Sequence, residues 1–314
     1  MGELPTLTRQ ESSIQDLTQH VPAIVKALST QLSKHSSPYS KIKEGVLEVY
    51  QAMSVALPEH MTLSIEAVLN DLLLLFKENS VELKVGVMDT LAKLFQRTPH
   101  SALLLTHAET LIGLFAKAIK ETYYEVQSAT LQTISHFADL LAREGAATIA
   151  PKLYEIIKER FQASAVDKSV KTTSILALSH LLAHFSAALP KTEVDASMLL
   201  LVERAFNEST WLQALQALSR LADSSCDVSK TLDKIVVGLV DLIDKRTGTY
   251  KFEVYKPLTA HLKNHALQPA SASKVLQTIV KDVSMYDFQI SSAALRLVTA
   301  VVSKRKDTGT ILKT

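Results

Sequence analysis

The stretch VPAIVKALSTQL, residues 21–32, decides the fold, because its apolar residues recur with the period of one helix face. The recurring apolar positions are Val21, Ile24, Val25, Leu28 and Leu32. A polar break follows at residues 35–38, and a second apolar pattern runs from Ile42 to the pair Leu57-Pro58. Proline lacks the N–H that a helix interior needs, so Pro58 marks a boundary. This region therefore predicts two helices joined by a short turn.

The two-helix pattern recurs along the rest of the chain. The expected repeats cover residues 17–58, 61–99, 107–145, 146–190, 193–225, 229–266 and 269–307. An apolar marker stands early in each expected second helix, at Ile42, Leu83, Val126, Val170, Leu212, Phe252 and Ile290. Successive markers lie 41, 43, 44, 42, 40 and 38 residues apart. HEAT and armadillo repeats are about 40–47 residues long, whereas tetratricopeptide and ankyrin repeats are about 33–34.

This spacing predicts an all-α fold, an α-solenoid of about seven HEAT-type antiparallel helix pairs wound into a right-handed, curved superhelix. Armadillo repeats usually add a third short helix, for which the spacing leaves little room. Pro257 falls inside an expected helix and should kink or shorten it. A new apolar segment starts at Ile311, so we expect residues 1–314 to form a single solenoid segment of a longer array.

Composition limits the class of protein. Hydrophobic residues make up 47% of the chain and charged residues 21%, which excludes a disordered chain. The net charge of +2 predicts no nucleic-acid partner, and the absence of a long apolar run predicts no membrane partner. Cys226 is the single cysteine, so an internal disulfide is impossible, which is typical of reducing compartments. We expect a cytoplasmic or nuclear protein.

The sequence contains no pattern for catalysis, cofactor binding or small-molecule binding. His180 and His184 are four residues apart on one expected helix face and could share a metal, but Leu181 stands where a zinc protease needs glutamate. Cys226 lies in a polar break with no activating base indicated. Trp211 either fills space between repeats or anchors a partner. We therefore expect no enzyme, no metal and no cofactor.

A distributed row of polar residues is the candidate binding site. These residues adjoin the markers: Lys43, Lys84, Lys171, Gln213, Lys251 and Glu253. By periodicity the residues directly after the markers should face solvent, namely Lys43, Lys84, Gln127, Lys171, Gln213, Glu253 and Ser291. In HEAT solenoids the second helices line the concave wall. The lysines would suit a partner protein with an acidic or mixed surface. The alternative is an ordinary solvated helix face.

The succession of repeats resembles the central region of the cullin-associated neddylation-dissociated protein family. The likeness is carried by residues 21–28, by residues 207–212 running into Ala217-Leu218, and by Asp287, Ile290 and Ala294. It covers about Leu17 to Val302. The resemblance implies a non-catalytic HEAT scaffold that binds an unmodified cullin–RING ubiquitin ligase scaffold and promotes exchange of its substrate receptors. It implies no catalytic residue.

Two other classes of HEAT scaffold stay open on sequence grounds. Nuclear transport receptors of the importin type tend to be acidic inside, whereas the expected inner row here contains lysines. Tubulin-binding or phosphatase-type scaffolds are the other class. Tubulin-binding arrays use basic turns and an exposed tryptophan, whereas here only Lys245-Arg246 makes a clearly basic turn.

Overall fold

The computed structural model describes residues 18–34, 40–99 and 101–303. These residues form helices and connecting turns and contain no strand, which confirms the predicted all-α class. The chain forms two compact units, unit 1 (Met1–Ile156) and unit 2 (Ile157–Thr314). Among the described residues, no helix is both long enough and apolar enough to cross a membrane.

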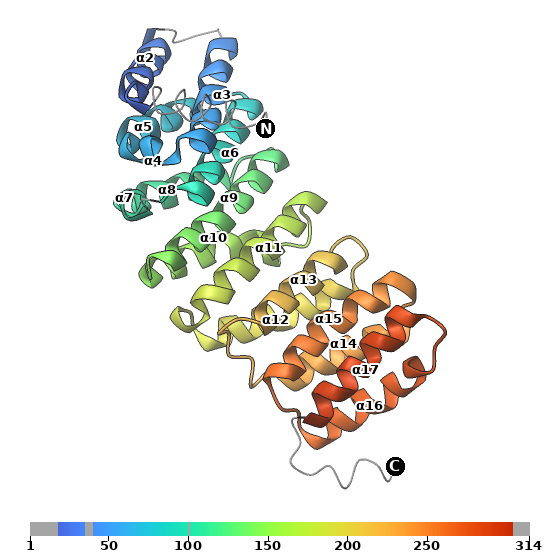
Figure 1. Ribbon diagram of the computed structural model, residues 1–314. Coiled ribbons are helices and arrows are strands. Elements are labelled where there is room, and N and C mark those ends of the chain that lie inside the picture. The colour runs from blue at the N-terminus through green and yellow to red at the C-terminus, as the bar shows by residue number, and fades with distance from the viewer. Residues whose placement is uncertain (1–17, 35–39, 100, 304–314) are drawn as a thin grey trace, which may run out of the picture. The chain divides into compact units, whose positions relative to one another are not determined.

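The described residues of unit 1 form three helix pairs and two additional short helices (Figure 1). Its helices are α2 (Val21–Lys34), α3 (Ser40–Ala56), α4 (Pro58–Leu63), α5 (Ile65–Phe76), α6 (Val81–Arg97), α7 (Ser101–Leu105), α8 (Ala108–Ala118) and α9 (Tyr124–Arg143). The second helices α3, α6 and α9 pack one against the next, and the first helix α2 packs against α5. Each pair thus buries its apolar face against the following pair, as in a solenoid.

Unit 2 repeats this arrangement. The 3₁₀ turn η1 (Ala147–Ile149) leads into α10 (Ala150–Gln162), which spans the boundary between the units. The remaining helices are α11 (Lys168–Phe185), η2 (Ser186–Ala188), α12 (Lys191–Phe206), α13 (Trp211–Ala222), α14 (Leu232–Lys245), α15 (Gly248–Asn264), α16 (Pro269–Val283) and α17 (Phe288–Ser303). The second helices α11, α13, α15 and α17 pack in sequence order, as do the first helices α12, α14 and α16. This packing confirms the predicted α-solenoid, while its handedness, its curvature and its continuity over the whole chain stay predictions.

Local sequence signals set several helix ends. Ser80 caps the beginning of α6, where its side chain accepts a hydrogen bond from the Leu83 amide at 3.2 Å. Asp167 caps the beginning of α11 in the same way, accepting from the Ser169 amide at 2.7 Å. Gly145 ends α9 with a φ of 67°, a left-handed conformation that glycine adopts without strain. These are the boundaries that the sequence breaks predict.

Aromatic and aliphatic side chains fill the space between neighbouring pairs. In unit 1 the Phe137 ring of α9 lies 5.0 Å from the Phe95 ring of α6 and 5.7 Å from the Phe115 ring of α8, measured between ring centroids. All three side chains are fully buried. Burial of this apolar surface is the main stabilising term of each interface between repeats.

Polar side chains also tie each pair to the one before it. Arg143 at the end of α9 donates to the Phe95 carbonyl of α6 at 2.6 Å, and Asn264 at the end of α15 donates to the Ala222 carbonyl of α13 at 2.6 Å. The last carbonyls of a helix have no partner within the helix, so a donor from the next repeat satisfies them. Sequence periodicity did not predict these links.

One expectation about the helices was wrong, and the alternative that Pro257 shortens its helix is excluded, while a kink at Pro257 stays a prediction. The short helices α4 and α7 precede α5 and α8, so repeats two and three do contain a third helix. Pro257 does not shorten its helix, because α15 continues past it to Asn264. Pro257 is buried and α15 packs against both α13 and α17, so tertiary contacts hold the helix across the missing hydrogen bond. The break at residues 35–38 and the segment from Ile311 lie outside the described residues.

Candidate protein-binding surface

The second-helix surface is the side of each unit formed by the second helices, α3, α6 and α9 in unit 1 and α11, α13, α15 and α17 in unit 2. All six residues of the predicted contact row lie in the first or second turn of these helices. That position puts them beside the turn that joins the two helices of the following repeat.

The lysines of unit 1 are ion-paired between repeats. The Lys43 ammonium lies 2.8 Å from a Glu78 carboxylate oxygen, and the Lys43 side chain is only 7% exposed. The Lys84 ammonium lies 2.8 Å from a Glu121 carboxylate oxygen, with the Lys84 side chain 12% exposed. The expectation that these residues face solvent was therefore wrong, because a carboxylate in the following repeat draws each ammonium inward.

Lys251 and Glu253 are also engaged in ion pairs. The Lys251 ammonium lies 2.6 Å from Asp282 of α16, and the Tyr255 hydroxyl donates to the same carboxylate at 2.6 Å. Burial, together with this buried carboxylate, raises the pKa of Tyr255 above its ordinary value. Glu253 accepts from Lys256 at 2.6 Å within α15. Lys251 is thus largely buried, and Glu253 is half-buried.

Lys171 and Gln213 differ from the other members of the predicted row. Both are half-buried on the second-helix surface, at the beginning of α11 and α13 respectively. Lys171 forms no ion pair with the described residues, although its charge helps to lower the pKa of Asp167, and Gln213 is uncharged. Both are therefore partly accessible, and their contact with a partner stays a prediction.

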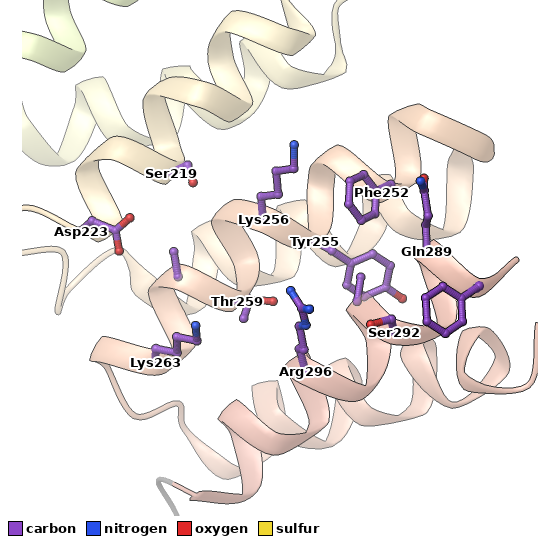
Figure 2. A pocket seen from close by; sticks show the side chains of 13 residues that line it. Ser219, Asp223, Phe252, Tyr255, Lys256, Thr259, Lys263, Gln289, Ser292 and Arg296 are labelled. Atoms are coloured by element: carbon purple, nitrogen blue, oxygen red, sulfur yellow. The ribbon is translucent and has the colours of Figure 1, made fainter.

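A groove on the second-helix surface of unit 2 was missed by the sequence analysis (Figure 2). It has a volume of about 560 Å³ and is formed by side chains of α13, α15 and α17. Figure 2 shows Lys256 and Lys263 projecting from α15, Arg296 from α17 and Asp223 from α13. Small and hydroxyl side chains form part of its lining, namely Ser219, Thr259, Ala260, Ser292 and Ala293.

Positive charge predominates in the lining of this groove. Lys256, Lys263 and Arg296 are exposed, and Asp223 is the one carboxylate among the lining residues. Lys256 is bound to Glu253, whereas Lys263 and Arg296 form no ion pair with the described part of the chain. The groove thus combines unneutralised cations with an accessible depression.

Aromatic side chains stand at one end of the groove. Phe252 of α15 is half-buried, and Phe288 at the first position of α17 is 84% exposed. Tyr286, in the turn just before α17, is fully exposed. Exposed aromatic residues next to a cavity are typical of protein-binding sites.

A sequence signal for this groove existed. Lys256 and Lys263 are seven residues apart on one helix and therefore share a face, and Arg296 occupies the corresponding helix of the next repeat. Phe288 precedes the marker Ile290 by two residues, which places it off the buried stripe. Only the stacking of α13, α15 and α17 shows that these residues surround one depression.

His180 and His184, the candidate metal pair, both lie in the second half of α11. His184 is exposed, and His180 lies 3.5 Å from the Arg220 guanidinium, measured from its Nδ1 atom. Within the described ranges, no three His, Cys, Asp or Glu side chains are grouped so that they could hold a metal ion.

Trp211 and Cys226 have packing environments. The Trp211 ring stacks on the Tyr250 ring of the following repeat at a centroid distance of 4.1 Å. The Arg246 guanidinium lies over the same Tyr250 ring, 4.7 Å from its centroid. Trp211 therefore fills space between repeats. Cys226 is buried, and burial raises the pKa of its thiol, which disfavours the reactive thiolate.

Solved structures share the fold. An engineered protein solved by the Northeast Structural Genomics Consortium aligns with a TM-score of 0.58 and 17% identity over 90% of this chain and 70% of that chain. A second engineered protein from the same consortium aligns with a TM-score of 0.53 and 14% identity over 75% of this chain and 98% of its own. At these identities the likeness concerns the fold alone. No protein-family model matches the chain.

The curated relatives that match the chain are all named cullin-associated NEDD8-dissociated protein, 1 or 2. The chain is 24% identical over 313 residues to cullin-associated NEDD8-dissociated protein 2 of Rattus norvegicus, which covers 95% of this chain and 24% of the relative. It is 22% identical over 233 residues to cullin-associated NEDD8-dissociated protein 1 of Dictyostelium discoideum, covering 72% and 18% respectively. The Arabidopsis thaliana protein 1 is 25% identical over 244 residues. This chain thus spans about a quarter or less of the length of these relatives.

These matches confirm the resemblance that the order of the repeats indicates: the chain is an α-solenoid similar, over up to 95% of its length, to the cullin-associated NEDD8-dissociated proteins.

Proposed function

We propose that the chain is a non-catalytic scaffold segment that binds a cullin–RING ubiquitin ligase scaffold in its unmodified form. The observation that carries this proposal is the similarity to proteins named as cullin-associated and NEDD8-dissociated, which extends over 95% of the chain in two of them. Those names describe association with a cullin and dissociation from NEDD8. A helix-pair array supports such a role, since it offers a long surface to a partner.

The proposed mechanism is coupled binding. A scaffold that contacts a cullin and a substrate receptor that contacts the same cullin can each lower the affinity of the other, so the receptor exchanges faster. In this mechanism the segment supplies binding surface and the parent protein supplies the remaining contacts. The proposed place of action is the cytoplasm, the nucleus or both.

The second-helix surface is the proposed contact face. Lys171 and Gln213 are the members of the predicted row best placed to touch the partner, because they are partly exposed and lie outside ion pairs within the described chain. The other members of the row have a structural role, because their ion pairs hold the second helices in place. They are Lys43, Lys84, Lys251 and Glu253.

A binding titration tests the proposal. The 314-residue chain is immobilised, and a cullin–RING complex is passed over it in the unmodified and the NEDD8-modified form. We expect saturable binding of the unmodified complex and at least about tenfold weaker binding of the modified one, a difference of about 1.4 kcal/mol. Lys171→Glu should weaken the first interaction, whereas Lys234→Glu, at an exposed position of the first helix α14, serves as the charge-matched control. Absence of binding to the unmodified complex, or equal binding of both forms, contradicts the proposal.

A further inference from the structure

We propose that the groove between α13, α15 and α17 binds a short acidic segment of a partner protein that carries an aromatic or large aliphatic side chain. This inference rests on the proposed scaffold function and specifies the chemistry of one contact. It is drawn from the charges, the apolar lining and the position of the groove in unit 2.

The charge of the lining selects an acidic segment. Lys263 and Arg296 lie on neighbouring second helices and have no carboxylate partner among the described residues. Lys256 shares its charge with Glu253, to which its ammonium is bound at 2.6 Å. Like charges around one depression repel one another, so carboxylates placed between them are attracted by both. A planar guanidinium such as that of Arg296 can bind a carboxylate through two parallel hydrogen bonds.

The apolar part of the lining selects a hydrophobic anchor. Phe252, Ala260, Ala293 and Phe288 lie in the same groove as the cations. Phe288 is 84% exposed in the free chain, and an incoming aromatic or aliphatic side chain would remove part of this surface from water. Exposed apolar surface of this kind beside cations distinguishes the groove from a site for a simple inorganic anion.

The same features favour a peptide over a nucleic acid. Nucleic-acid sites depend on positive charge spread over many phosphate contacts, whereas this chain carries a net charge of only +2. Asp223 stands at the α13 side of the groove, so the positive charge there is confined to the α15 and α17 side, where a few carboxylates can be placed but an evenly charged phosphate backbone would also pass Asp223. A volume of about 560 Å³ is within the usual range for a site that accepts a few side chains.

Fluorescence polarisation with labelled peptides tests this inference on the 314-residue chain. The probe is a peptide of about ten residues in which Asp and Glu surround a central Phe-Leu pair. One comparison peptide replaces Phe-Leu by Ser-Ser, and a second replaces every acidic residue by Lys. We expect saturable binding of the probe, clearly weaker binding of the Ser-Ser peptide and no binding of the basic one.

Variants of exposed residues then locate the site. Arg296→Glu and Lys263→Glu should each weaken probe binding about tenfold or more, because each replaces an attraction by a repulsion. Phe288→Ser should weaken the probe but leave the Ser-Ser peptide unchanged. Lys281→Glu makes the same charge change at an exposed position of α16 outside the groove and should change binding less than about twofold. Unaltered circular dichroism of each variant confirms that it is folded.

Three results would overturn the inference: no saturable probe binding, equal weakening by Lys281→Glu and Arg296→Glu, or tighter binding of a single-stranded oligonucleotide of the same charge. These outcomes are separable from the cullin titration. If the chain binds cullin while the peptides do not bind, the groove assignment fails and the scaffold function stands. If the probe binds, Arg296→Glu abolishes probe binding and cullin does not bind, the assignment of the groove is supported and cullin is the wrong partner.

Discussion

His261 is a fully buried histidine on α15, and within the described chain neither ring nitrogen forms a hydrogen bond of normal geometry. Burial, and to a smaller extent the neighbouring His265, lower its pKa from 6.5 to about 4. The Leu218 carbonyl opposes this shift in part. The neutral ring is therefore the form compatible with the folded state.

This burial predicts that unit 2 loses stability in mild acid. His261 binds a proton near pH 6.5 in the unfolded chain but only near pH 4 in the folded chain. The stabilising contribution of the neutral His261 ring is therefore complete above pH 6.5 and is lost as the pH falls towards 4. The unfolding free energy should drop by about 2 kcal/mol between about pH 7 and pH 5. Urea titrations followed by fluorescence of Trp211, the single tryptophan, report on unit 2.

The matched variants are His261→Leu and His184→Leu. His261→Leu removes the buried ring. It should reduce the pH dependence of the unfolding free energy, whatever its effect on stability at neutral pH. The second removes an exposed histidine and should leave the pH dependence unchanged. A pH dependence that survives in His261→Leu contradicts the assignment.

For the residues of the predicted contact row, the sequence predicted the positions but not the ion-pair partners. The positions of Lys43, Lys84 and Lys251 on the second helices were predicted from the period. Their ion pairs were not, because Glu78, Glu121 and Asp282 lie about 31–37 residues away, next to the turn of the following repeat. Which carboxylate meets which ammonium depends on how consecutive repeats stack, and this is not encoded in the helical period.

At the scale of helices, Gly238 allows α14 to approach α12 closely. A Cβ atom built at Gly238 would lie 2.5 Å from Cγ1 of Val202, a distance that packed carbons do not reach. Val202 is β-branched and has few alternative rotamers in a helix, so it cannot easily move aside. Gly113, in α8, has open space around the same position.

These two glycines predict opposite effects of one substitution. Gly238→Ala should destabilise unit 2 by about 1–2 kcal/mol, because overpacking exceeds the gain of about 1 kcal/mol in helix propensity. Gly113→Ala should stabilise unit 1 by about 0.5–1 kcal/mol, since only the propensity changes. Thermal unfolding followed by circular dichroism measures both. In a Val202→Ala background the penalty of Gly238→Ala should largely disappear, and its persistence would show that Val202 is not the obstacle.

Most helices were predictable, and the misses have physical reasons. The main helices agree with the apolar period to within a few residues, because each needs one buried face. The short helices α4 and α7 fell below the length at which a period is visible. The sequence alone could not show that α15 continues past Pro257, because the local penalty of proline is offset by packing against α13 and α17.

At the scale of the molecule, the groove formed by α13, α15 and α17 exists only because three repeats stack. Each repeat contributes one or more lining residues, and none of them is recognisable as a site alone. The sequence therefore predicted a binding surface on the second helices but placed it at the turn edge. The structure adds a depression farther along the same helices of unit 2.

Hydrogen–deuterium exchange of the chain, alone and with the unmodified cullin–RING complex, tests the central claim that a partner binds on the second-helix surface. We expect added protection on α11, α13, α15 and α17, strongest around Lys256–Lys263 and Phe288–Arg296, with little change on the first helices α12, α14 and α16. Protection confined to α12, α14 and α16, or stable binding without protection of any second helix, would contradict it.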